Sequence, residues 1–246
     1  MTTSAFQRAR LSASAQEVFA TLPAMGRIMI NTRWNGATHE RMGAVENVTF
    51  ENGWAICTGA EHASRIELAR IASIIVDRTS IMGGEAYPRL DFHLDDDSVL
   101  CSVISFAGLA PFDAALAALD PGEELSIEDK PARGPASEEQ PNDPGLVAFE
   151  RALAGGDTVT IGIERPGFIQ SWEGVVEKVS PSRGFINVMR PDFHLHLRMG
   201  AVHGWRSAEQ DGKLVLFATD ADGTDTGLTV RGNSETLAEK ALEQAY

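Results

Sequence analysis

Histidines are the residues of this chain with the clearest capacity for chemistry, because an imidazole can bind a metal ion or carry a proton near neutral pH. His194 and His196 stand two apart within residues 192–198, where strict alternation places both on one face of a strand. Two imidazoles on one face suit a metal ion, although the sequence shows no third ligand at a characteristic spacing. The alternative is a polar stripe on the surface of a sheet.

His39 stands out because the chain contains a second copy of its surroundings. A segment of about 45 residues recurs once at a constant displacement of 131 residues, so that Gly36 falls on Gly167 without a gap. In this second copy the position of His39 is occupied by Gln170. The asymmetry marks His39 as a candidate functional residue, and the alternative is a structural or surface histidine beside Glu40.

The elements that must position these residues are mainly strands. Apolar and polar residues alternate from Arg27 onward, and Asn35-Gly36 favours a tight turn between two strand-forming runs. Residues 27–48 are therefore predicted to form a hairpin with His39 on its second strand. Helical spacing and composition predict helices over residues 9–21, 111–119, 146–154 and 234–246.

A break in composition divides the chain. Residues 120–144 contain five prolines among many acidic and small residues, which makes the segment too polar to build a core, and it is predicted to be a linker. The predicted organisation is an N-terminal helix with the first repeat over 1–108, a helix and the proline-rich acidic linker over 109–156, and the second repeat with a C-terminal helix over 157–246.

The composition is that of a globular protein with an acidic surface. The chain has 246 residues, of which 43% are hydrophobic, and a net charge of −14. Nucleic acids and anionic membranes require a cationic surface, so neither is predicted as a partner. Cys57 and Cys101 form no disulfide framework, and no segment has the roughly 20 apolar residues of a membrane-spanning helix, so the protein is predicted to be cytoplasmic and without membrane insertion.

Sequence motifs of common enzyme classes are missing. The chain has no G-x-S-x-G, no P-loop, no G-x-G-x-x-G and no pair of C-x-x-C motifs. No hydrolase, transferase or nucleotide-binding activity is therefore predicted, and no catalytic residue is assigned.

Two stretches carry a family resemblance. TRWNGATHERMG, at residues 32–43, and GVVEKVSPSRGFINVMRPDFHLHLR, at residues 174–198, resemble the two repeats of the HemS/ChuS/HmuS haem-utilisation (hemin-degrading factor) proteins, and more distantly the half-size ChuX/HutX proteins. The resemblance implies an α+β fold of two tandem repeats, each a curved antiparallel β-sheet with flanking helices, related by a pseudo-two-fold axis. It also implies haem as the bound group.

The same resemblance assigns three residues to a haem site. His39 matches a proposed ligand of the haem iron, and Arg65 matches an arginine that approaches the haem propionates. His62 is a third candidate, because half-size relatives use a histidine in this region. The residue types suit these roles, since imidazole is a common ligand of haem iron and a guanidinium can hold a carboxylate with two hydrogen bonds.

The chain also departs from the family. The family's Asp-Leu-Arg segment becomes Ala63-Ser64-Arg65, and no histidine occurs from residue 107 to 184, where full-length members carry another haem ligand. The leading hypothesis is a protein of bacterial haem and iron utilisation that accepts, buffers or delivers cytoplasmic haem, with a haem transporter, a redox partner or a second copy of the chain as further partners. The alternatives are a reductant-dependent haem-degrading enzyme, and a shortened member that has lost haem binding and acts as an interaction scaffold.

Overall fold

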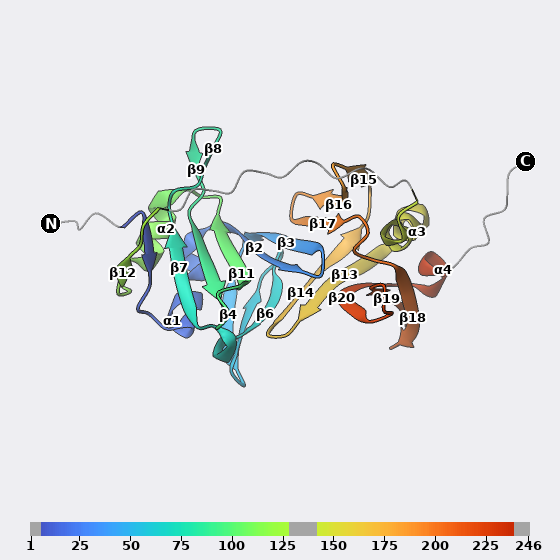
Figure 1. The fold of residues 1–246 in the computed structure, drawn as a ribbon, viewed down its shortest axis with the longest axis horizontal. Helices are drawn as coiled ribbons and strands as arrows, with labels where there is room; N and C mark the ends of the chain where they lie inside the picture. The colour runs from blue at the N-terminus through green and yellow to red at the C-terminus, as the bar shows by residue number, and fades with distance from the viewer. Residues whose placement is uncertain (1–5, 128–141, 239–246) are drawn as a thin grey trace, which may run out of the picture.

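The computed structural model describes residues 6–127 and 142–238 and consists mainly of antiparallel strands (Figure 1). The strands of the first repeat are β2 (Arg27–Trp34), β3 (Ala37–Ala44), β4 (Asn47–Glu51), β5 (Trp54–Thr58), β6 (Ala63–Glu67), β7 (Ser73–Asp77), β10 (Arg89–His93) and β11 (Val99–Ser105). Their counterparts in the second repeat are β13 (Thr158–Arg165), β14 (Phe168–Val175), β15 (Val179–Ser182), β16 (Phe185–Arg190), β17 (Phe193–Arg198), β18 (Gly204–Gln210), β19 (Lys213–Thr219) and β20 (Asp225–Gly232).

The two repeats exchange strands to build two large sheets. The ten-stranded sheet has the order β12-β1-β7-β10-β11-β2-β3-β17-β16-β15, where β1 is Arg8–Arg10 and β12 is Glu123–Glu124. The eight-stranded sheet has the order β18-β19-β20-β13-β14-β6-β5-β4. Each sheet thus joins five strands of one repeat to three strands of the other, β15–β17 in the larger sheet and β4–β6 in the smaller, and the larger sheet is extended at one edge by β1 and β12. This arrangement interlocks the repeats and relates the sheets by a pseudo-two-fold axis. The sequence-based division at residues 108 and 156 stays a prediction.

The hairpin that carries His39 forms as predicted. Asn35 and Gly36 both have positive φ angles, of 43° and 84°, which two-residue turns of this handedness require. Strand β3 pairs on its other side with β17, and the register sets His39 opposite Leu195 and Thr38 opposite His196. Because neighbouring side chains alternate between faces, this register sends His39 to the core side and Thr38 to the outer side of the sheet.

The helices are few and short. They are α1 (Ala15–Phe19), α2 (Leu109–Leu116), α3 (Val147–Gly155) and α4 (Ser234–Leu237), with 3-10 turns η1 (Leu22–Met25), η2 (Leu68–Arg70) and η3 (Pro144–Leu146). Helix α1 begins at a capping box in which Ser14 and Glu17 bond each other's backbone. Among residues 6–127 and 142–238, no helix is long and apolar enough to cross a membrane.

The predicted helix over residues 9–21 is wrong in its first part. Strand β1 (Arg8–Arg10) pairs with β7, with Ala9 opposite Val76, and with the two-residue strand β12 (Glu123–Glu124). Pairing with the edge of the sheet therefore outweighs the helical spacing there. The predicted linker and C-terminal helix fall largely on residues 128–141 and 239–246, outside the described residues.

A small separate hairpin contains β8 (Ile81–Met82) and β9 (Glu85–Ala86).

Candidate functional site

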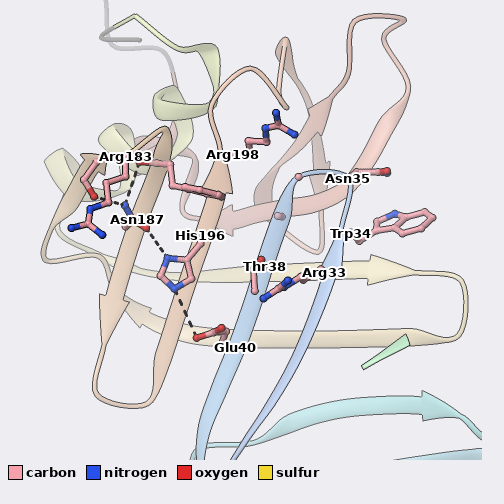
Figure 2. Close-up of a pocket in the computed structure, with 13 residues that line it drawn as sticks. Arg33, Trp34, Asn35, Thr38, Glu40, Arg183, Asn187, His196 and Arg198 are labelled. Atoms are coloured by element: carbon pink, nitrogen blue, oxygen red, sulfur yellow. Dashed lines mark hydrogen bonds and ion pairs between the residues drawn. The ribbon is translucent and has the colours of Figure 1, made fainter. Parts of the chain in front are cut away.

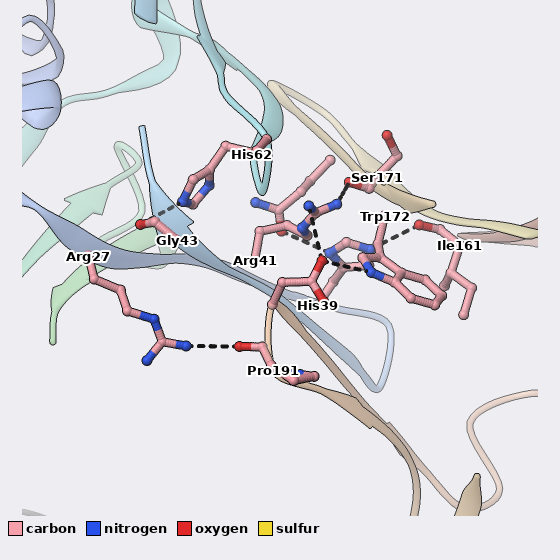
Figure 3. A network of polar contacts seen from close by, with 12 residues as sticks. Arg27, His39, Arg41, Gly43, His62, Ile161, Ser171, Trp172 and Pro191 are labelled. Atoms are coloured by element: carbon pink, nitrogen blue, oxygen red, sulfur yellow. Dashed lines mark hydrogen bonds and ion pairs between the residues drawn. The ribbon is translucent and has the colours of Figure 1, made fainter. Parts of the chain in front are cut away.

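His39, on β3 of the ten-stranded sheet, points toward β13 and β14 of the eight-stranded sheet, with none of its surface exposed (Figure 3). Its Nε2 is 3.1 Å from the carbonyl oxygen of Ile161, and its Nδ1 is 2.8 Å from Oε1 of Gln170. The ring packs at 4.8 Å on Phe193, which stacks in turn on Trp172. Both ring nitrogens are therefore engaged within the protein.

The contact between His39 and Gln170 lies at the pseudo-two-fold axis. These residues occupy equivalent positions of the two repeats, and so do Ile30 and Ile161. The bond of His39 to the carbonyl of Ile161 is mirrored by a bond of 3.1 Å from Nε2 of Gln170 to the carbonyl of Ile30. Gln170 also donates to the hydroxyl of Ser64 at 2.8 Å. The two equivalent positions that differ in the sequence, His39 and Gln170, are therefore in direct contact with each other.

The burial of His39 decides its charge. Removal from water lowers the pKa of His39 to about 4, although its hydrogen bonds to Gln170 and Ile161 act in the opposite direction. The imidazole is therefore neutral at pH 7, and because a neutral ring carries a single N–H it donates to one of these two oxygens only. To bind haem iron it would have to leave a fully buried position and give up its contacts with Gln170 and Ile161, so its role as an iron ligand stays a prediction that this geometry does not favour.

His62 is also buried, at 3% exposure, and bonds the carbonyl oxygen of Gly43 through Nε2 at 3.2 Å (Figure 3). Burial is the main cause that lowers the pKa of His62 to about 4, and the charge of nearby Arg41 adds to it. Its Nδ1 is buried and has no hydrogen-bond partner among the described residues. His62 and His39 both lie close to Arg41, on the inner side of the sheets.

Arg65 lies on the other side of its strand. Ser64 points inward to Gln170, and alternation along β6 sends the adjacent Arg65 to the exposed face, where its guanidinium lies 5.3 Å from the ring centre of Trp54. The structure therefore does not bring Arg65 together with His39. A cavity of about 700 Å³ beside Trp54 is lined by further apolar groups, including Ile169 and Phe217, and no histidine is among the described residues that line it.

A larger cavity, of about 870 Å³, lies on the outer face of the other sheet, over β3, β17 and β16 (Figure 2). We call it the β3–β17 pocket. It contains one imidazole, that of His196, two aromatic side chains, Trp34 and Phe185, and three guanidinium groups, from Arg33, Arg183 and Arg198. Glu40, Thr38 and Asn187 contribute further polar groups.

The imidazole of His196 is held in one orientation. Its Nδ1 lies 2.6 Å from Oδ1 of Asn187, on the neighbouring strand β16, while Nε2 faces the carboxylate of Glu40 (Figure 2). Partial burial lowers the pKa of His196 below its ordinary value, with Glu40 opposing this shift and Arg33 adding to it. The side chain is partly exposed to the pocket and offers Nε2 to a ligand there.

The two cavities share part of their lining through the repeat, since Gly167, Ile169 and Trp54 of the smaller cavity are equivalent to Gly36, Thr38 and Phe185 of the larger one, whereas Arg65 is not among the residues that line the smaller cavity. His196 pairs with Thr38 across the β3–β17 seam, and Arg65 pairs with Ile169 at the equivalent place on the β14–β6 seam. The displacement of 131 residues relates both members of these pairs, and it relates Phe185 to Trp54. Alignment of the two repeats therefore places His196 at the position of Arg65 and could have indicated His196 as a haem-site candidate. From its spacing to His194 alone, His196 is expected to be a surface residue or a metal ligand.

Comparison with known proteins gives the family context. Residues 3–79 match the family model described as the haemin-degrading HemS.ChuX domain. The predicted family resemblance is confirmed. No curated protein matches the chain in sequence.

Solved structures extend the likeness to the whole chain. ChuS of E. coli, described as a heme oxygenase, superimposes with a TM-score of 0.73 at 18% identity, covering 92% of this chain and 83% of ChuS. Holo-PhuS of Pseudomonas aeruginosa, described as a heme-binding protein, gives a TM-score of 0.74 at 16% identity, covering 92% of this chain and 81% of PhuS. The predicted α+β two-repeat fold is confirmed by these matches.

Proposed function

We propose that this protein binds haem in the β3–β17 pocket and handles it within bacterial haem utilisation. The observation that supports this most is the combination of side chains in one cavity of about 870 Å³, which is within the range of small-molecule and cofactor sites. One oriented imidazole, two aromatic rings and three guanidinium groups correspond to the three parts of haem: the iron, the flat apolar ring and the two propionates.

Each group has a defined task in this proposal. Nε2 of His196 would bind the iron, since the amide oxygen of Asn187 accepts a hydrogen bond from the N–H at Nδ1 and this tautomer leaves a lone pair on Nε2. Trp34 and Phe185 cover apolar surface of the porphyrin. The three arginines hold the propionates, which would otherwise be repelled by a protein of net charge −14.

Titration with haem tests the proposal. Wild-type protein is expected to give a saturable shift of the Soret band, and His196→Ala is expected to lose the spectrum of a histidine-ligated haem, because no other imidazole of the described residues lines the pocket. His203→Ala removes an exposed histidine elsewhere in the second repeat and should leave the spectrum unchanged. An unaltered Soret band in folded His196→Ala would refute the assignment.

The pseudo-symmetric position provides a second control. Arg65→Ala changes the residue that is equivalent to His196 in the other repeat and that does not line the β3–β17 pocket, so it is expected to leave haem affinity unchanged if haem occupies that pocket. A weakened affinity in Arg65→Ala, with His196→Ala behaving as wild type, would instead favour the propionate role that the sequence assigns to Arg65.

The arginines can be tested separately. Arg198→Gln is expected to weaken haem binding about tenfold, because it removes one charge-assisted contact of roughly 1.5 kcal/mol to a propionate. The affinity is measured by titration at low and high salt, and the loss should shrink as salt screens the wild-type contact. Arg206→Gln, at an exposed arginine of β18 that bonds Asp225, serves as the matched control. Equal losses in both variants would argue against a local propionate contact.

Binding and degradation are separable in the same sample. We propose binding, buffering or delivery in the cytoplasm as the function, which the buried free thiols of Cys57 and Cys101 suit. Reductant-dependent degradation is the second candidate, supported by the likeness to ChuS. Added reductant and oxygen should leave the Soret band in place if the protein only binds haem, and loss of the band that persists with catalase present would favour degradation.

A further inference from the structure

A cluster of three metal-binding side chains lies at one edge of the β3–β17 pocket. It consists of Glu40, His194 and His196, whose ligand atoms all lie within 4.8 Å of one another. We propose that these three residues bind one divalent transition-metal ion, such as iron(II) or zinc(II), in protein that carries no haem. This site goes beyond haem binding and does not depend on it.

The strand pairing creates the cluster. Alternation along β17 puts His194 and His196 on the same outer face, and the β3–β17 register sets Glu40 directly opposite His194. Oε2 of Glu40 is 3.3 Å from Nδ1 of His194 and 3.8 Å from Nε2 of His196. These separations leave space for an ion between the three atoms, since metal–ligand bonds of about 2.0–2.2 Å place ligand atoms roughly 3 Å apart.

The orientation of His196 is that of a metal ligand. The amide nitrogen of Asn187 is surrounded by three acceptors for its two hydrogens, the carbonyl oxygens of Ser180 and Phe185 and the hydroxyl of Ser182, so its amide oxygen must face His196. That oxygen accepts a hydrogen bond from Nδ1 of His196, which lies 2.6 Å away. Nε2 is left as a lone pair directed toward Glu40. Ligand histidines in metal sites are commonly fixed in this way by a second partner.

The three side chains are partly buried. The side chains of Glu40, His194 and His196 are 13%, 25% and 31% exposed, so they are shielded from bulk water but reachable by an ion from solvent. Fewer water molecules therefore have to be displaced from the ligand atoms when an ion binds.

The ligand set selects the class of metal. Two imidazoles and one carboxylate are typical of zinc and of non-haem iron(II) sites that keep open coordination positions, whereas magnesium and calcium prefer oxygen ligands. The open positions would face the β3–β17 pocket, which His196 and Glu40 line. Because haem iron and the bound ion would both need Nε2 of His196, the two are expected to exclude each other.

Cobalt(II) titration of the haem-free, metal-free full chain tests the site, with calorimetric titration of zinc(II) as a second measurement. One ion is expected to bind per chain and to give the visible spectrum of cobalt with nitrogen ligands. Asn187→Ala, which removes only the partner that orients His196, should weaken metal binding about 10–100-fold. His194→Ala and Glu40→Ala each remove a ligand and should weaken binding by more than this. His203→Ala and Glu209→Ala, at exposed positions, are the matched controls.

The variants also separate this site from the haem site. His194→Ala, at a residue outside the lining of the pocket, should keep the Soret shift while losing the ion, whereas His196→Ala should lose both. Glu40→Gln, which keeps the shape of the side chain, and a thermal melt of each variant establish that the fold persists. Zinc should raise the melting temperature of wild type and not of the variants. Absence of binding, or binding that is equal in wild type and in all three ligand variants, would overturn the proposal.

Discussion

His39→Ala is expected to lower the free energy of unfolding by about 3–5 kcal/mol. The change empties a fully buried position that packs on Phe193, and it removes the imidazole that faces the carbonyl oxygen of Ile161 and the amide oxygen of Gln170 between the sheets. A cavity and unpaired buried polar groups both add to the loss. Urea-induced unfolding, followed by fluorescence and circular dichroism, measures it.

His39→Gln provides the matched control, because it installs the residue of the twin position. A glutamine can bond both Gln170 and the carbonyl of Ile161 through its amide, so the expected loss is only about 1 kcal/mol. The folded variant should still give the Soret shift with haem. If His39→Gln folds as wild type and loses that shift, His39 is the iron ligand that the family resemblance implies.

Acid is expected to destabilise the protein over the range from about pH 6.5 to about pH 4. His39 and His62 are buried as neutral rings with pKa values lowered to about 4, whereas the unfolded chain protonates each near 6.5. In this interval the unfolded state binds more protons than the folded state, so the free energy of unfolding falls as the pH falls. The expected loss is about 3 kcal/mol for each histidine and levels off below pH 4.

Urea unfolding at several pH values between 7 and 4 measures this dependence. Carboxylates contribute to acid unfolding as well, so the comparison is with the double variant His39→Gln, His62→Gln, which keeps the carboxylates and removes the two buried imidazoles. The double variant should show a clearly shallower dependence on pH. If the free energy of unfolding depends on pH equally in the wild type and in the double variant, the two buried histidines do not cause the loss of stability in acid.

Much of the fold follows from local sequence patterns. The alternation within residues 192–198 predicts His194 and His196 on one face, and the structure has both on the outer face of β17, with Leu195 and Leu197 buried beneath. Asn35-Gly36 predicts the turn of the hairpin, which has the expected backbone angles. The constant displacement of 131 residues predicts two related halves. These features depend on neighbours in sequence or on comparison of one segment with another.

The strand exchange is a feature that only the tertiary structure decided. Alternation shows which side chains share a face of a strand, but it does not show which face is buried or which strand lies alongside. Pairing of β3 with β17 brings together residues more than 150 positions apart, and packing of the second sheet, with Ile161 and Gln170, on one face of this pair buries His39 and leaves Glu40 on the outer face.

The same pairing reassigns the candidate residues. His39, which the sequence favours as a ligand, meets its own twin at the pseudo-two-fold axis, while Glu40 provides the third group that the sequence could not find for His194 and His196. The sequence by itself determined the chemistry available: the histidines, the arginines and the duplicated strands. The tertiary structure decided which of them face a cavity, because the exposure of a strand residue is set by partners from distant parts of the chain.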